Sequence, residues 1–135
     1  MKDYRFKKAQ IEHSKGNLKK ALNIYKAIPQ NHRDNSVILY QSLCLQQIGR
    51  TKEAIEEFET LNSDTLNSYP ELITAALLHK FFGQLESAIS ILKKAKTSFP
   101  GNSATHINLA TLFLSLSRHL DAERELILAE QCGDN

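Results

Sequence analysis

Four residues stand at an almost constant interval along this chain. Gly16, Gly49, Gly83 and Ser117, which we name the turn residues, are 33, 34 and 34 positions apart. We call each position, counted from the turn residue of its copy, a slot. Slot +5 always holds alanine, slot +9 a large side chain and slot −7 a small one. In chain order these slots hold Ala21, Ala54, Ala88 and Ala122; Tyr25, Phe58, Leu92 and Leu126; and Ala9, Ser42, Ala76 and Ala110. A fixed period of this length is the signature of stacked repeats and limits the fold more than any other feature.

Each copy of the repeat predicts two helices joined by a turn. Apolar residues recur every three or four positions before the turn residue, as in LYQSLCLQQIG, and after it, as in GQLESAISILKKAK. Glycine suits the left-handed conformation that closes a helix, and Pro70 suits the first turn of the next one. Stretches such as PQNHRDNS and FPGNS supply turns between copies. The sequence therefore predicts an all-α chain of four helix pairs, in repeats 2–34, 35–68, 69–102 and 103–135.

The small residues predict where paired helices approach each other. Ala76 with Ala88, and Ala110 with Ala122, occupy slots at which a larger side chain would push the two helices apart. Slot −5 is predicted to point inward, which makes Cys44 a small buried hydrophobe rather than a nucleophile. Its four occupants are Ile11, Cys44, Leu78 and Leu112.

This pattern resembles the tetratricopeptide repeat family, whose unit is a helix–turn–helix of 34 residues. The resemblance covers residues 2–135 and is strongest in the third copy, which holds Ala76, Gly83, Leu85, Ala88, Leu92, Ala95 and Pro100 in family slots. It implies a single domain, 1–135, wound as a right-handed superhelix that binds proteins and is not an enzyme. The first copy departs from the family with Arg5, Lys8 and Glu12 at usually apolar slots, which we interpret as a polar N-terminal cap.

The resemblance places the first helix of each pair on a concave face. Slots −13, −10, −6 and −3 share one side of that helix, and their leucines and isoleucines predict an apolar groove for an amphipathic helix or an extended apolar peptide. The alternative is that these side chains pack against neighbouring repeats. The predicted partner-binding residues are Phe6, Gln10, His13, Leu39, Tyr40, Leu43, Ile73, Leu77, Phe81, Ile107 and Leu114.

One specialisation of the family is not predicted here. Some members hold the C-terminal carboxylate of heat-shock chaperones with a clamp of Lys, Asn and Arg. The matching positions are Phe6, Gln10, Tyr40, Pro70 and Thr74, and none of them is basic or asparagine.

Charge is divided unevenly along the chain. Residues 1–33 carry nine Lys or Arg against two acidic residues, whereas residues 34–135 carry eight against thirteen. The basic end favours an acidic protein partner or the acidic end of a second copy. Elsewhere the partner is expected to be apolar. Nucleic acid is disfavoured because only Tyr4, Phe6 and Tyr25 offer rings for stacking in that region.

The pattern of reactive residues indicates no catalytic chemistry. The five histidines fall in different copies without metal-binding spacing, and the glycines are isolated rather than grouped as in a phosphate-binding loop. No metal and no cofactor are predicted. Two cysteines and the lack of a long apolar run favour a cytoplasmic protein without a membrane span.

Two other functions stay open at this point. Repeats of this kind often precede catalytic domains such as sulfotransferases or glycosyltransferases, so the chain is alternatively the substrate-recognition or regulatory arm of a larger enzyme. The third possibility is self-association through the C-terminal helix, because Leu126, Ile127 and Leu128 come late in the sequence with no further helix to cover them.

Overall fold

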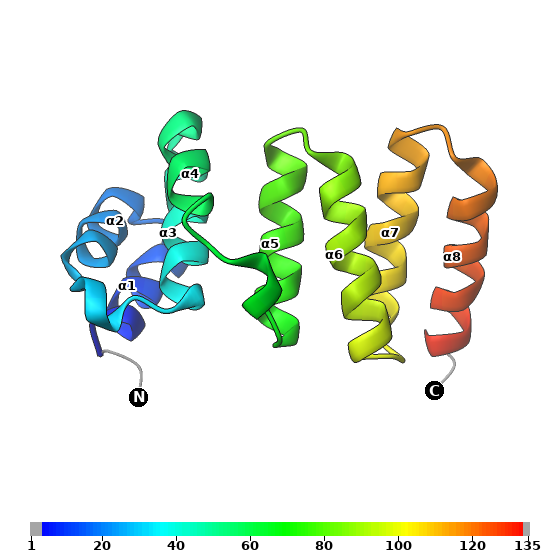
Figure 1. The fold of residues 1–135 in the computed structure, drawn as a ribbon, viewed down its shortest axis with the longest axis horizontal. Coiled ribbons are helices and arrows are strands. Elements are labelled where there is room, and N and C mark those ends of the chain that lie inside the picture. The colour runs from blue at the N-terminus through cyan, green and yellow to red at the C-terminus, as the bar shows by residue number, and fades with distance from the viewer. Residues whose placement is uncertain (1–3, 134–135) are drawn as a thin grey trace. The chain divides into compact units, whose positions relative to one another are not determined.

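The protein is built only of helices in the part that the structure describes. The computed structural model describes residues 4–133, which form two compact units, residues 1–66 and 67–135 (Figure 1). The first unit contains α1 (Tyr4–Ser14), α2 (Leu18–Ala27), α3 (Asn35–Ile48) and α4 (Thr51–Phe58), with 3-10 turns at Gln30–His32 and Ser63–Thr65. The second contains α5 (Tyr69–Phe81), α6 (Leu85–Ser98), α7 (Ser103–Ser115) and α8 (His119–Gly133). The prediction of an all-α chain is confirmed, whereas the single domain and the superhelix stay predictions.

The turn residues close the first helix of each pair as predicted. Gly49 follows α3 with φ of 100°, and its N–H donates to the Gln46 carbonyl at 3.0 Å. Ser117 follows α7 in the same left-handed region, with φ of 59°. A residue with a Cβ pays about 1 kcal/mol for that conformation, so the fourth turn is the strained one.

Short polar side chains cap the starts of α3 and α5. Ser68 forms a capping box with Glu71 at the start of α5, where Pro70 occupies the first turn as predicted. The Val37 N–H donates to the Asp34 carboxylate at 3.1 Å at the start of α3. These bonds satisfy backbone N–H groups that have no partner inside the helix.

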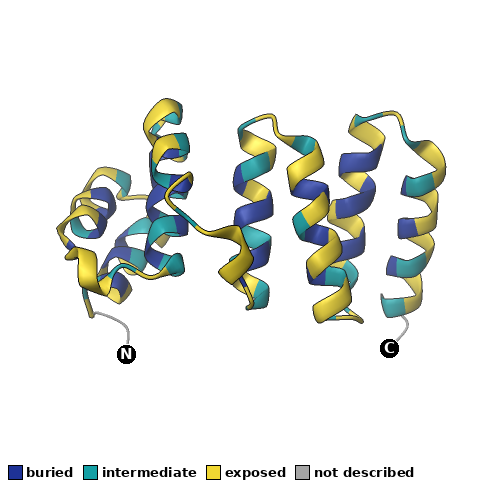
Figure 2. Ribbon diagram, viewed as in Figure 1, coloured by how far each residue is buried: buried dark blue, intermediate teal, exposed yellow. Residues whose placement is uncertain are grey.

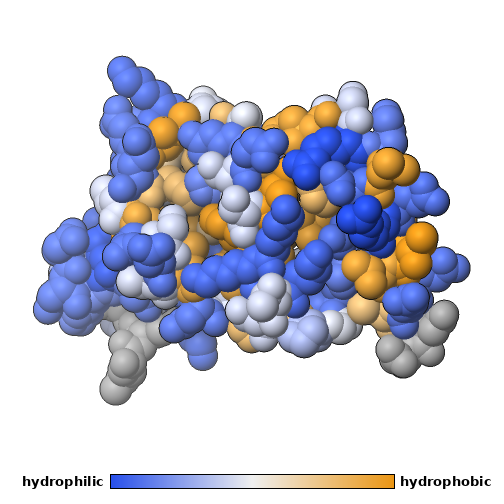
Figure 3. Space-filling view, turned by 45° about the vertical axis from the view of Figure 1, so that its right-hand side comes forward, coloured by the Kyte–Doolittle hydropathy of each residue, from blue (hydrophilic) through white to orange (hydrophobic). Residues whose placement is uncertain are grey.

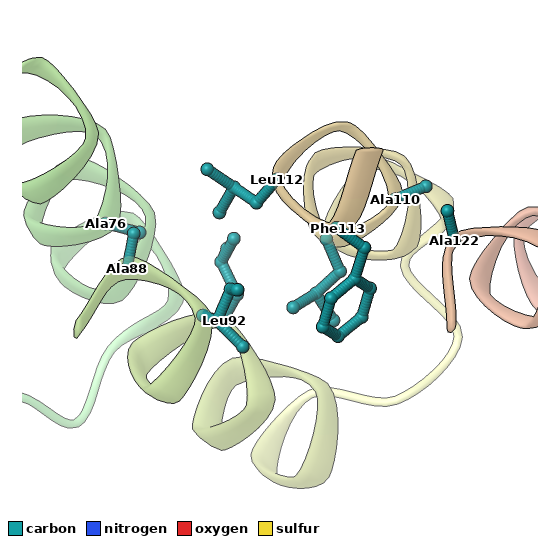
Figure 4. Close-up of a cluster of buried hydrophobic side chains, with 9 residues drawn as sticks. Ala76, Ala88, Leu92, Ala110, Leu112, Phe113 and Ala122 are labelled. Carbon is teal, nitrogen blue, oxygen red and sulfur yellow. The ribbon is translucent and has the colours of Figure 1, made fainter. Parts of the chain in front are cut away.

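The core lies between the helices of each unit. Buried positions run along the sides of the helices that face their neighbours, and exposed positions cover the outer sides (Figure 2). In the second unit Ala76 and Ala88 lie side by side where α5 meets α6, and Ala110 faces Ala122 where α7 meets α8 (Figure 4). The small residues at slots −7 and +5 therefore mark the close approaches, as the sequence predicts.

Slot −5 departs from its prediction in the first copy. Cys44 is fully buried, its thiol donates to the Leu18 carbonyl at 3.2 Å, and burial raises its pKa to about 11. Ile11 in the same slot is 54% exposed, because α1 has no preceding helix pair among the described residues. Glu12 is buried instead and accepts from the Asn17 amide at 2.8 Å, so this part of the polar cap faces inward.

The second cysteine, Cys132, lies on α8 and is half-buried. None of the helices that the structure describes has the length and apolarity to cross a membrane.

Candidate functional site

The first unit carries four of its six predicted partner-binding residues around one hollow. Gln10 and His13 of α1 and Tyr40 and Leu43 of α3 line an open hollow of about 700 Å³. Lys7, Ile11, Ser14 and Tyr25 complete its lining. The spacing of the first-helix slots therefore brought these four side chains to one place on the surface of the unit.

The other two predicted residues of this unit are in the core, which corrects the prediction. Phe6 is 1% exposed and Leu39 is 0% exposed, so neither side chain is accessible to a partner. Phe6 packs between the rings of Tyr25 and Tyr40, at centroid distances of 6.2 Å and 5.7 Å. For these two residues the alternative interpretation, packing inside the protein, is the right one.

The wall of the hollow is a fixed set of aromatic rings. Nδ1 of His13 lies 3.0 Å from the Tyr25 hydroxyl, and its Nε2 lies 2.5 Å from Oε1 of Gln47. The His13 ring also stands edge-on to Tyr40 at 6.5 Å. Burial raises the pKa of Tyr25, so its hydroxyl keeps its proton and can donate. The hollow therefore combines aromatic surface, hydrogen-bonding groups and the cationic Lys7.

The second unit forms a smaller and more enclosed groove between α5 and α7. Ile73, Leu77 and Lys80 of α5 line one side of a hollow of about 140 Å³, and Asn108 and Thr111 of α7 line the other. Ala76, Leu92 and Leu112 line the rest of it and belong to the core cluster. The base of the groove is therefore continuous with the packed core, and its shape is set by that packing.

Large apolar side chains stand exposed on the same two helices. Leu77 is 37% exposed and Phe81 47% on α5, while Ile107 is 49% and Leu114 50% exposed on α7. All four are predicted partner-binding residues, and Ile73, the fifth in this unit, is half-buried in the groove. Figure 3 shows such apolar surface broken up by hydrophilic surface on one face of the protein.

Two buried charge clusters were missed by the sequence interpretation. In the second unit Glu125 of α8 accepts from Nζ of Lys96 and from Nδ1 of His106, each at 2.7 Å, with its side chain 7% exposed. Burial alone would raise the pKa of Glu125, but these two hydrogen bonds outweigh it and hold the pKa below its usual value.

The cluster of the first unit is centred on Arg33, in the slot where the third copy has Pro100. Its guanidinium donates to the carbonyl of Tyr25 at 2.8 Å, to Glu57 at 3.0 Å and to Gln41. Glu57 and Glu125 share slot +8, so the acidic residue recurring there in the second and fourth copies was the signal. Each cluster ties consecutive helix pairs of its unit together.

Neither cluster forms a metal site. Among residues 4–133, no group of three or more His, Cys, Asp or Glu side chains is placed to hold a metal ion. His79 is half-buried, and its Nδ1 lies 2.7 Å from Oε1 of Gln84.

Comparison with solved structures places this geometry in a known fold. The structure of YrrB, described as a TPR protein with an unusual peptide-binding site, matches with a TM-score of 0.76 over 94% of this chain and 66% of its own, at 13% identity. The chain has the tetratricopeptide-repeat fold. MamA from residue 41 to its end, from Desulfovibrio magneticus RS-1, matches with a TM-score of 0.79 over 96% of this chain and 74% of its own, at 15% identity. A MamA double mutant matches at 0.78 with 16% identity and the same coverage. No family model and no curated protein sequence matches the chain.

Proposed function

We propose that this tetratricopeptide-repeat chain is a non-catalytic protein-binding module that takes a helical or extended apolar peptide in the groove between α5 and α7. In this role it serves as an adaptor, scaffold or co-chaperone. The observation that carries the proposal is the set of four large apolar side chains exposed on the two helices that form this groove, of which Leu77 lines the groove itself: Leu77, Phe81, Ile107 and Leu114.

The energetic reason is the exposure of these side chains to water. Covering one half-exposed leucine or isoleucine is worth roughly 1–2 kcal/mol at about 25 cal/mol per Å². Four of them give a few kcal/mol beyond what backbone and polar contacts supply, which suits a peptide bound in the micromolar range. The groove is preformed by the core beneath it, so little ordering of the protein opposes binding.

Charge suggests the chemistry at the ends of the peptide. Lys80 lines the groove of the second unit and Lys7 lines the hollow of the first. An apolar segment with an acidic residue beside it therefore fits either site better than a basic one. YrrB, described as a TPR protein with an unusual peptide-binding site, supports the same class of ligand. The two free cysteines suit a reducing compartment, which favours the cytoplasm as the location.

The test is peptide selection with a matched pair of variants. A display library of random peptides is selected on the wild type, and the affinity of each selected peptide is then measured for Leu77→Asp and Leu120→Asp. Leu120 lies on α8 and is 77% exposed, so it controls for the same change of chemistry outside the groove. We expect Leu77→Asp to weaken binding at least about tenfold, which corresponds to about 1.4 kcal/mol, and Leu120→Asp to change it little.

Two results would contradict the proposal. Equal binding by Leu77→Asp and the wild type would place the peptide elsewhere, and Ile107→Asp, on the other side of the groove, then serves as the second check. A folded wild type that selects no peptide at all would favour the arm of a larger enzyme over a self-sufficient binding module.

A further inference from the structure

Two helices, one in each unit, leave one side uncovered. The α1 stripe consists of Tyr4, Lys8, Ile11 and Lys15, with Tyr4 76% and Ile11 54% exposed. The α8 stripe consists of Leu120, Glu123, Leu126, Ile127 and Glu130, with Leu120 77%, Leu126 47% and Ile127 49% exposed. Figure 3 shows apolar surface close to the C-terminal end of α8. The late apolar residues that the sequence marked as uncovered are thus exposed at Leu126 and Ile127, and Leu128 is half-buried.

In later copies of the repeat, the slots of the α1 stripe hold side chains that pack against the preceding helix. The same slots −12, −8, −5 and −1 hold Thr105, Leu109, Leu112 and Leu116 in α7. The first three are buried and Leu116 packs on the core cluster that includes α6. In α3 slots −12 and −5, Val37 and Cys44, are buried too, and Cys44 contacts the backbone of α2. The α1 stripe is therefore the side of a first helix that receives the second helix of a preceding pair.

The α8 stripe occupies the complementary slots of a second helix. Slots +6 and +9 hold Ile89 and Leu92 in α6, where both are buried in the cluster with α7 (Figure 4). Slot +10 holds Lys93, whose Nζ lies 5.9 Å from the ring centroid of Phe113 on α7. In α8 the same three slots hold Glu123, Leu126 and Ile127, and all three are exposed.

The two stripes match in both charge and apolarity when they are paired as α6 and α7 are. α6 and α7 are joined by residues 99–102 and run antiparallel, so successive contacts advance along α6 and go back along α7 (Figure 1). Slots +6 and −1 hold Ile89 in the core cluster and Leu116 packed against it, and they hold Glu123 on α8 and Lys15 directly after α1. Slots +9 and −5, which hold Leu92 and Leu112, hold Leu126 and Ile11. We propose that α8 of one copy docks on α1 of a second copy, head to tail, with an apolar contact between Leu126 and Ile11 and an ion pair between Glu123 and Lys15.

The charges next to this pair fit the docking. Lys7 and Lys8 add to the positive side, and Glu130 adds to the negative side. Arg124 is the opposing charge on α8, and its guanidinium lies 3.9 Å from Asp121 of the same helix. Arg124 is thus the one like charge that α8 brings to the lysines of α1, and the Asp121 carboxylate of the same helix already offsets it.

The expected strength follows from the size of the contact. The α1 helix has 11 residues and is therefore about 16 Å long, which is short for an interface of the standard size of about 1,600 Å². We expect association in the range of about 10 μM to about 1 mM, weakened by salt because exposed charges contribute to it. The surface is separate from the α5–α7 groove, so either proposal can fail without the other.

Charge reversal tests the pairing residue by residue. Lys15→Glu, Glu123→Lys and the double variant carrying both changes are compared with the wild type by sedimentation over that concentration range. Lys19→Glu and Glu56→Lys repeat the same charge changes at positions outside both stripes. We expect the average mass of the wild type to rise above 15.3 kDa with concentration. Each single reversal should weaken association about tenfold, the double variant should restore it, and both controls should behave as the wild type.

A mixture of the two single variants gives a second readout. Lys15→Glu keeps an intact α8 stripe and Glu123→Lys keeps an intact α1 stripe, and the two reversed stripes carry matching charges as in the double variant. The mixture should therefore recover the association that each single variant alone has lost. A wild type that stays at 15.3 kDa throughout would overturn the proposal. Association that survives both single reversals, or a double variant that does not recover, would overturn it as well.

Discussion

In the first unit the residues of slot −10, Phe6 and Leu39, are 1% and 0% exposed. Their counterparts in the second unit, Ile73 and Ile107, are half-buried and 49% exposed. The four residues occupy the same place in the repeat and have similar hydrophobicity, so neither property decides their burial. The comparison shows that a single slot can serve the core in one unit and the surface in the other.

The difference arises from the neighbouring slots. Tyr25 and Tyr40 place large rings against Phe6 in the first unit. The slots of these two tyrosines hold Leu92 and Asn108 in the second unit, which are smaller and leave a groove of about 140 Å³ open above the core. The size of the side chains at slot +9 and at slot −9 of the following copy thus sets how much of this side of the first helix stays open to a partner.

The two units also solve one packing problem with different residues. Each places a glutamate at slot +8 and gives it a cation from the preceding helix pair. Arg33 reaches Glu57 from a loop and also bonds backbone carbonyls, whereas Lys96 and His106 reach Glu125 from helices. The carboxylate at this slot is the common element, and the cation varies.

The largest expected effect is the difference in stability lost when a buried and an exposed residue of slot −10 are each truncated to alanine. Phe6→Ala should lower the free energy of unfolding of the first unit by about 3 kcal/mol, because it leaves a cavity between two tyrosine rings. Ile107→Ala should cost the second unit less than about 1 kcal/mol, because half of that side chain is already in water. Urea denaturation followed by circular dichroism, with hydrogen exchange to assign the loss to a unit, measures both. Equal losses would break the comparison.

A smaller effect concerns the glutamates of slot +8. Glu125→Gln should destabilise the second unit by about 1.5 kcal/mol at neutral pH, because it removes two charge-assisted hydrogen bonds. Glu57→Gln should cost the first unit less, because its side chain is 22% exposed and Arg33 keeps other acceptors. Urea denaturation of both variants measures the difference, and a larger loss for Glu57→Gln would contradict this ranking.

The same variant predicts a pH dependence. Because the pKa of Glu125 is lower in the folded protein than its ordinary value of 4.5, its ionised form stabilises the fold above that pH. This contribution is lost as the pH falls through the folded pKa. The difference in stability between the wild type and Glu125→Gln should therefore shrink below pH 4.5. A difference that stays constant down to the most acidic folded condition would contradict the role given to the charge.

The smallest expected effect concerns the turns. Ser117→Gly should stabilise the second unit by about 0.5–1 kcal/mol, because it relieves the left-handed conformation at φ of 59°. Gly49→Ser should destabilise the first unit by a similar amount. Gly49 has a φ of 100°, and a Cβ added there would meet no other atom within 4 Å, so only the backbone conformation opposes the change. Thermal unfolding should therefore shift in opposite directions for the two variants, and shifts of the same sign would show that conformation at the turn is not the cause.

Much of the fold was predictable because single residues of the repeat are each restricted in type by a local requirement of the fold. The alanines at slots −7 and +5 and the glycines at the turns each exclude larger residues for a local reason, and such reasons can be read without a structure. The exposure of Leu77, Phe81, Ile107 and Leu114 was predictable too, because these residues occupy or flank the first-helix slots that were expected on the concave face. The burial of Phe6 and Leu39 was not, because it depends on which side chains of other helices fill the space above them. The cluster around Glu125 was also missed, because its three members come from three helices.

The central claim is that the α5–α7 groove is the peptide-binding site, and methyl NMR of the complex with a selected peptide tests it most directly. With leucine and isoleucine methyl groups labelled, we expect contacts from the peptide to Leu77, Ile107 and Leu114. Contacts only to methyl groups outside the groove, such as those of Leu120 and Ile127 on α8, would contradict the claim.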